Sequence, residues 1–297
     1  MDNNTQPVFD RAAEDIGNSV GLEHINVTVP DQVNATLFYI TGMGFTRDPY
    51  IMTGLENMWV NIGRSQVHCP ARAAQVLRGH TGIVQPDRAA LMKRLEYVAP
   101  KLAGTKFAYK DCGEYVETHC PWGNTFKVYE PDPSRFGGVM VGMPYVEFEV
   151  PPGVADGIAR FYNQVIEAPA TVVDEPAGRA ARVMVGHHQH LVFRETSKPI
   201  PEYDGHHLQI YLADFSGPHR WLKAKGLITE ESDQYQYRFK DIVDPDSGKF
   251  LYTIEHEVRS MTHPLYARPL VNRNPVQTNR NYRPGYDAGY WATPHSN

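Results

Sequence analysis

Short runs of alternating polar and hydrophobic residues occur four times along the chain, and each is followed by a stretch with helical spacing. Alternation is typical of half-buried β-strands, whereas apolar residues every three or four positions indicate an amphipathic helix. The expected strands cover 24–30, 80–86, 145–151 and 207–213, and they begin with His24, His80, Tyr145 and His207. The expected helices cover 31–42, 87–102, 154–166 and 217–225.

Further strand-like segments follow each helix, so the repeating unit is a strand, a helix and about three strands. The second and fourth units end alike: Glu130 and Glu255 each follow a turn glycine by seven positions. One such βαβββ module buries only one face of its sheet, so modules must pair to close a core.

We expect two domains, one from modules one and two over residues 20–132 and one from modules three and four over 140–259. The turn-rich segment 131–138 separates them. Residues 260–297 are rich in proline, asparagine, arginine and tyrosine and form an expected irregular C-terminal tail.

Composition and charge limit the classes of binding partner that the sequence predicts. The 297 residues are 41% hydrophobic and 21% charged, as in a globular protein, and the net charge of −5 gives no footprint for nucleic acid or an anionic membrane. The first residues lack the basic and apolar regions of a signal peptide, so a cytoplasmic location is expected. The spacing of the three cysteines does not indicate a metal site, and free thiols are expected, although a Cys112–Cys120 disulfide is the alternative.

Paired βαβββ modules with a histidine on the first strand and a glutamate on the last resemble the vicinal oxygen chelate superfamily, which includes glyoxalase I, the bleomycin-resistance proteins and the type I extradiol dioxygenases. The resemblance covers about residues 20–259. It implies an α+β fold in which four βαβββ modules form two domains with open, strongly curved mixed β-sheets. Two such domains in one chain most resemble the extradiol dioxygenases.

The resemblance also implies a divalent metal held by two histidines and one carboxylate, the set used by non-heme Fe(II) oxygenases. Carried onto this sequence, it gives His24, His80 and Glu130 if modules one and two pair. If module one pairs with module four, the set is His24, His207 and Glu255, with Glu257 as the alternative carboxylate because it shares a strand face with Glu255.

Glyoxalase-type enzymes have a fourth protein ligand, which would fall near His68 and Cys69. Because neither residue is the usual carboxylate or amide, a three-ligand site is expected.

Other residues are candidates for proton transfer or substrate contact. By resemblance, His188 and His190 lie where extradiol enzymes carry a catalytic histidine, and Tyr145 and Tyr237 are candidate acid–base groups. Trp122 and His119, before the Glu130 strand, are candidate substrate contacts.

These features together predict a metal-dependent oxygenase, similar to Fe(II) ring-cleaving dioxygenases of aromatic compound catabolism, acting on a small molecule bound through vicinal oxygens. Fe(II) is the expected metal, with Mn(II), Zn(II), Co(II) and Ni(II) as alternatives. A metal-dependent lyase or isomerase that uses no O2, and a metal-free binding protein, are the competing hypotheses. A homo-oligomer is common in such proteins.

Overall fold

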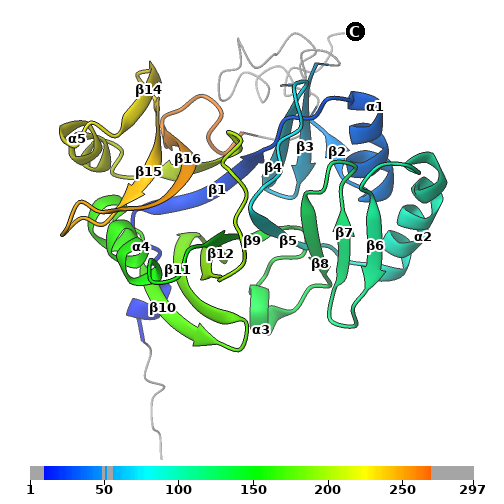
Figure 1. The fold of residues 1–297 in the computed structure, drawn as a ribbon, viewed down its shortest axis with the longest axis horizontal. Helices are drawn as coiled ribbons and strands as arrows, with labels where there is room; N and C mark the ends of the chain where they lie inside the picture. The colour runs from blue at the N-terminus through cyan, green and yellow to red at the C-terminus, as the bar shows by residue number, and fades with distance from the viewer. Residues whose placement is uncertain (1–9, 49–50, 52–55, 269–297) are drawn as a thin grey trace, which may run out of the picture.

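The computed structural model describes residues 10–48, 51 and 56–268, which form two eight-stranded mixed sheets that do not close into barrels (Figure 1). The first sheet has the order β14 (Ile228–Asp233), β15 (Gln236–Val243), β16 (Phe250–Ser260), β13 (His207–Leu212), β1 (Ser19–Asn26), β4 (Ser65–Pro70), β3 (Asn57–Ile62), β2 (Thr46–Arg47). The second has the order β10 (Ala170–Glu175), β11 (Gly178–Gly186), β12 (Gln189–Glu195), β9 (Gly142–Val150), β5 (Gly79–Val84), β8 (Thr125–Tyr129), β7 (Val116–His119), β6 (Ala108–Asp111). The predicted α+β fold of four βαβββ modules with open mixed sheets is thereby confirmed.

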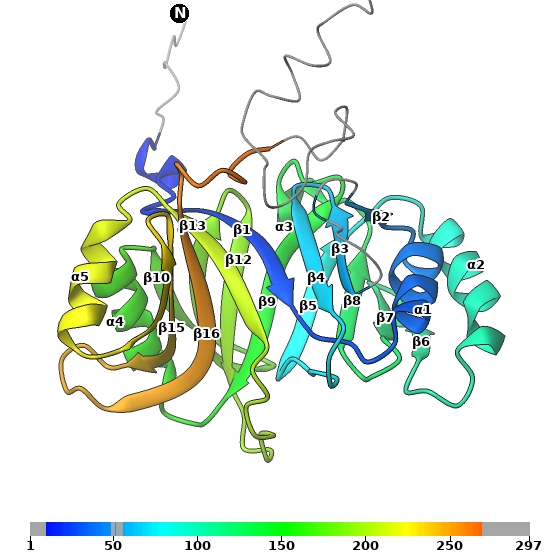
Figure 2. The ribbon, with the colours of Figure 1, turned by 90° about the horizontal axis from the view of Figure 1, so that it is seen from above.

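The sheets join modules that are distant in sequence. Strand β1 of module one pairs antiparallel with β13 of module four, and β5 of module two pairs antiparallel with β9 of module three. In Figure 2 these strands lie in the middle of the molecule, between the helices at its two ends. The ligand set His24, His80 and Glu130 required a sheet shared by modules one and two, and no such sheet forms. Module one shares its sheet with module four instead, as the alternative pairing predicted.

The helices lie where the hydrophobic spacing predicts them. Two of them begin at aspartates whose carboxylates cap the first turn: Asp31 accepts from the amides of Val33 and Asn34, and Asp87 accepts from that of Ala90. The bounds are α1 (Gln32–Ala35), continued by the π-helix η2 (Thr36–Gly42), α2 (Arg88–Val98) with the 3-10 turn η3 (Ala99–Lys101), α4 (Ala155–Phe161) with the π-helix η4 (Tyr162–Ile166), and α5 (Ser216–Ala224). Two short elements complete the chain: the 3-10 turn η1 (Ala12–Glu14) and α3 (Pro133–Phe136), which lies in the predicted link.

Aromatic pairs of the core join the two modules of each half of the sequence, within one hydrophobic core that runs through both halves. Phe38 of module one lies 5.8 Å from Phe126 of module two, and Phe161 of module three lies 5.8 Å from Phe239 of module four, measured between ring centroids. Helices α1 and α2 accordingly gather at one end of the molecule and α4 and α5 at the other (Figure 1). The division into domains 20–132 and 140–259 remains a prediction, since both sheets contain strands from the two halves.

Two smaller expectations concern the cysteines and the tail. Cys69, Cys112 and Cys120 are free thiols, as predicted. The predicted tail begins as strand, since β16 ends at Ser260, and Leu265 then packs against Ile51 and Trp59. Residues 269–297 of the predicted tail lie outside the described residues. No helix of the described residues is long and apolar enough to cross a membrane.

Candidate metal centre

Two histidines meet on one face of the first sheet because its central strands are antiparallel. In the register of β1 and β13, His24 is opposite Gln209 and His207 is opposite Asn26. The imidazole centroids of His24 and His207 are therefore only 5.9 Å apart, although the residues are 183 positions apart in sequence.

Glu257 supplies a carboxylate to the same place. Strand β16 lies parallel to β13 with Gln209 opposite Glu257. One ligand atom from each of His24, His207 and Glu257 lies within 4.8 Å of the other two, and all three residues are buried. Two imidazoles and one carboxylate at this spacing match the facial set that holds a divalent ion and leaves positions open.

A β-bulge fixes the orientation of His24. The register of β1 shifts between Leu22 and His24, so Glu23 is the extra residue of the strand. Its carboxylate Oε2 lies 3.3 Å from Nδ1 of His24, as expected when Nδ1–H donates to it. Because the proton is then held on Nδ1, the lone pair of Nε2 is free for a metal, an arrangement common among metal-binding histidines.

His207 has a similar carboxylate beside it. Its Nδ1 lies 3.5 Å from Oε1 of Glu255, and its Nε2 lies 3.5 Å from Oε2 of Glu257. Arg238 forms ion pairs with both glutamates, and Arg259 holds Glu23 and Glu257 at 2.9 and 2.5 Å. Three carboxylates against two guanidinium groups leave one negative charge in excess, which favours a bound cation.

The protonation states also suit metal binding. Burial lowers the pKa of His24, with a partial offset from the hydrogen bond to Glu23, so the imidazole stays neutral at pH 7. Burial alone would raise the pKa of Glu257, but the charge of Arg259 and the nearby His207 imidazole outweigh it and hold that pKa well below its usual value. A neutral imidazole and an ionised carboxylate are the forms that bind metal ions.

The unpaired atoms at the centre provide a test of whether a metal fits. Among the described residues, Nε2 of His24 and Nε2 of His207 are both buried and have no hydrogen-bond partner. A buried polar atom without a partner costs about 1–3 kcal/mol, and a divalent metal ion held by His24, His207 and Glu257 would remove this cost at both nitrogens.

His68 occupies the fourth position implied by the repeat. On β4, His68 lies opposite Asn26 of β1, just as Glu257 on β16 lies opposite Gln209 of β13. An approximate two-fold axis therefore relates the positions of His68 and Glu257. Its ring is 5.9 Å from that of His24 and stacks on Trp59 at 3.7 Å. His68 is therefore the nearby candidate for a fourth ligand or a proton acceptor, whereas Cys69 is fully buried in the hydrophobic core.

The set His24, His80 and Glu130 is not brought together. His24 lies in the first sheet and His80 in the second, because module one pairs with module four. Glu130 is exposed just beyond β8, and the residue that corresponds to Glu257 in the parallel register of β5 and β8 is Lys127. Aligning Glu130 with Glu255 from the turn glycines was wrong, because β16 spans 11 residues and β8 only five.

The other predicted residues lie away from this centre. Tyr145 and His190 lie on strands of the second sheet, His188 lies in the turn between β11 and β12, and all three line a separate cavity there. Trp122 and His119 lie at the β7–β8 turn of that sheet, where His119 contacts Thr125. Tyr237 is on β15 of the first sheet but packs against Phe215 and His219 on the α5 side, because it alternates with Arg238, which faces the metal centre.

Several polar groups at the centre were not predicted. Glu23 has no repeat signal, because a bulge brings it into the site. Asn26 and Gln209 lie two positions along their strands from His24 and His207, so strand alternation places them on the same face. Asn26 Oδ1 and both amide atoms of Gln209 are buried without a hydrogen-bond partner among the described residues. That alternation was the available signal for these two residues.

The fold is that of a four-module vicinal oxygen chelate protein, and in the described residues His24, His207 and Glu257 form a candidate metal centre between its first and last modules. No family model matches the chain, and no curated protein matches its sequence. Solved structures do resemble it.

Glyoxalase I from Zea mays aligns with a TM-score of 0.56 at 13% identity, covering 80% of this chain and 92% of that chain. A candidate dioxygenase from Bacillus subtilis aligns with a TM-score of 0.54 at 16% identity, covering 82% of this chain and 86% of that chain. These similarities confirm the predicted resemblance at the level of the fold.

Proposed function

We propose that this protein is a metal-dependent oxygenase that acts on a small organic molecule, with Fe(II) held by His24, His207 and Glu257. The observation that carries the proposal is the meeting of these three donors from modules one and four, with both imidazole Nε2 atoms buried and unpaired. When bound, such an ion supplies a Lewis-acidic centre with open positions for two vicinal oxygens of a substrate and for O2.

The residues of the chain supply orientation and proton transfer. Trp59, whose ring centroid is 4.8 Å from that of His24, offers a flat apolar wall for a ring-shaped substrate. Asn26 and Gln209 offer unpaired amide atoms that can bind substrate oxygens. His68 is the proton acceptor: burial and the neighbouring His24 and His207 hold its pKa well below the usual value, so it is neutral at pH 7.

His68 also supports a second candidate, a metal-dependent lyase or isomerase that uses no O2. Because it occupies the two-fold counterpart of the Glu257 position, it can complete a four-ligand site for an ion such as Zn(II), Ni(II) or Co(II). A fourth protein ligand removes one position that O2 would need.

Metal analysis tests the shared part of both candidates. The protein is purified anaerobically with Fe(II) and its bound metal is measured by mass spectrometry. One ion per chain is expected, and the ion is lost in Glu257→Gln but kept in Glu130→Gln, whose carboxylate is exposed. Failure to bind any first-row metal stoichiometrically rules out both candidates.

Oxygen consumption then separates the two candidates. A panel of catechols is added to the Fe(II) form in an oxygen-electrode cell, and ring-cleavage products are followed by absorbance. Uptake of O2 with product formation is expected. Two results together support the lyase or isomerase instead. The protein binds metal stoichiometrically but takes up no O2 with the panel, and its Zn(II) or Ni(II) form loses the metal in His68→Ala.

A further inference from the structure

The second sheet contains a counterpart of the metal centre, which we call the second cup and define by His80, Lys127 and Tyr145. Tyr145 lies opposite Gly82 as His24 lies opposite Gln209, so Tyr145 takes the place of His24 and His80 that of His207. Lys127 lies opposite Gly82 on the other side, as Glu257 lies opposite Gln209. The metal-binding carboxylate is therefore replaced by an ammonium group.

This replacement reverses the charge preference of the cup. Val192 takes the place of His68. Of the four positions that correspond to the metal centre, only the one held by His80 therefore keeps a side chain suited to bind a metal ion. Within the described part of the chain no ion pair reaches Lys127, whose Nζ lies 5.2 Å from the Tyr115 ring. An ammonium group without a counter-ion repels a metal ion and attracts an anion.

The second cup is also hollow. A cavity of about 500 Å³ opens there, large enough for a small organic ligand. Its walls carry more positive than negative side chains: Lys127, Arg135, Arg182 and Arg194 against Glu147 and Glu175. The lining thus has two positive charges in excess, and Arg135 also lies 3.5 Å from Glu114 outside the lining.

Two half-buried histidines of the cavity, His80 and His190, add no charge near pH 7. Burial, with Lys127 and Arg194 nearby, lowers the pKa of His80 to about 3. Burial, with Arg182 and His188 nearby, lowers the pKa of His190 to about 4. The excess of two charges therefore comes from lysine and arginine and persists across the neutral range.

The glutamates are already engaged by one arginine. Arg194 donates to Glu147 at 3.0 Å and to Glu175 at 2.8 Å, so this cluster is held in place. Arg182 lies 3.8 Å from Glu175 and is partly exposed at the cavity. Lys127 and Arg182 are therefore the groups best placed to receive an anion.

An aromatic wall completes the cup. Nε2 of His80 lies 3.1 Å from the Tyr145 hydroxyl, which lies 2.9 Å from the Tyr129 hydroxyl. The Tyr145 ring lies over Gly82, where an added Cβ would come within 2.1 Å of its Cε1, so only glycine leaves room for the ring. The wall suits a ligand with a flat hydrocarbon frame.

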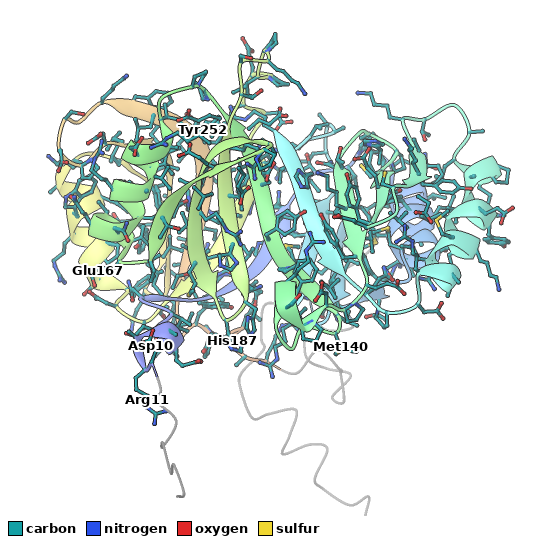
Figure 3. The ribbon with its side chains drawn as sticks, turned by 90° about the horizontal axis from the view of Figure 1, so that it is seen from below. Asp10, Arg11, Met140, Glu167, His187 and Tyr252 are labelled. Atoms are coloured by element: carbon teal, nitrogen blue, oxygen red, sulfur yellow. The ribbon has the colours of Figure 1, made fainter. Side chains whose placement is uncertain are left out.

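The link between the predicted domains closes one side of the cavity. Helix α3 contributes Ser134, Arg135 and Phe136 to the lining, and the following Gly137 packs against the His188 ring. Figure 3 labels His187, which precedes His188, and Met140, three positions after Gly137, and both lie along the same edge of the molecule.

We propose that the second cup is a metal-independent binding site for a small organic dianion with a flat frame, either an aromatic dicarboxylate or an aromatic phosphate monoester. The excess positive charge supplies affinity for two acidic groups, and the Tyr129–Tyr145–Phe136 wall receives the frame. This site is distinct from the metal centre, because the two lie on different sheets.

Calorimetric titration of the full-length, EDTA-treated protein tests the proposal. The probes are phthalate and phenyl phosphate, with neutral phthalamide as the matched control. At least one dianion is expected to bind about ten-fold or more tightly than phthalamide, because its acidic groups form charge-assisted hydrogen bonds that the neutral diamide cannot form. The tighter of the two identifies the acidic group. If neither dianion binds more tightly than phthalamide, the proposal is wrong.

Variants locate the binding. Lys127→Met is expected to weaken dianion binding about 10–100-fold, whereas Lys93→Met, an exposed lysine on α2, leaves it unchanged. Arg182→Gln, at a position partly exposed to solvent, is expected to weaken binding about three-fold and tests the site even if Lys127→Met fails to fold. His24→Ala should leave the affinity unchanged. Unchanged affinity in both cup variants, or loss of binding in His24→Ala, would overturn the proposal.

Discussion

Replacing His80 by glutamine is expected to make the protein less sensitive to acid. The imidazole is 12% exposed, and burial together with the charges of Lys127 and Arg194 lowers its pKa from 6.5 to about 3. Glutamine keeps an amide nitrogen that can contact the Tyr145 hydroxyl but cannot bind a proton in this range.

The sign and size of the effect follow from proton linkage. Between pH 6.5 and pH 3 the unfolded chain binds a proton at His80 that the folded protein does not, so the free energy of unfolding falls as the pH falls through this window. At about 1.36 kcal/mol per pH unit below 6.5, His80 accounts for a loss of about 2 kcal/mol between pH 7 and pH 5. Above pH 7 the residue has almost no effect.

Urea unfolding at pH 7 and pH 5, with EDTA present to remove metal binding, measures this loss. From pH 7 to pH 5, the free energy of unfolding is expected to fall by about 2 kcal/mol more in the wild-type protein than in His80→Gln. His187→Gln replaces an exposed histidine near the same cavity and should behave as the wild type. An equal pH dependence in His80→Gln and the wild type would refute the reasoning.

Two further substitutions test the supporting contacts of the two sites. Glu23→Gln removes the carboxylate at Nδ1 of His24 and should weaken metal binding about 10–100-fold in competition with a chelator; unchanged affinity would mean that this contact does not orient the imidazole. Gly82→Ala places a methyl group against the Tyr145 ring and should lower the free energy of unfolding by about 1–3 kcal/mol, whereas Gly21→Ala meets open space and should not; equal melting temperatures would contradict the close packing.

The fold was largely predictable because its signals are local. Alternation marks the first strand of each module, helical spacing marks the helix that follows, and aspartates at 31 and 87 cap two of those helices. A pattern of this kind depends on residues within one element, so it can be recognised without knowing the neighbours of that element.

The candidate site was predictable only in part. His24 and His207 were indicated by their equivalent places in the repeat, and the alternative pairing named both. Glu257 was indicated less directly, as the partner of Glu255 on one strand face. Lys127 was missed because β8 is shorter than β16, so aligning the turn glycines gives the wrong register. Glu23 was missed because no repeat predicts a bulge.

The sequence by itself determined the modules, their order and which residues could bind a metal, since those properties depend on side-chain type and short-range spacing. The tertiary structure decided which modules share a sheet. Antiparallel pairing of β1 with β13 brought His24 to His207, while pairing of β5 with β9 left His80 beside Tyr145 and Lys127. Strand pairing between distant segments depends on how all the faces pack at once, and that competition cannot be read from any one stretch of the chain.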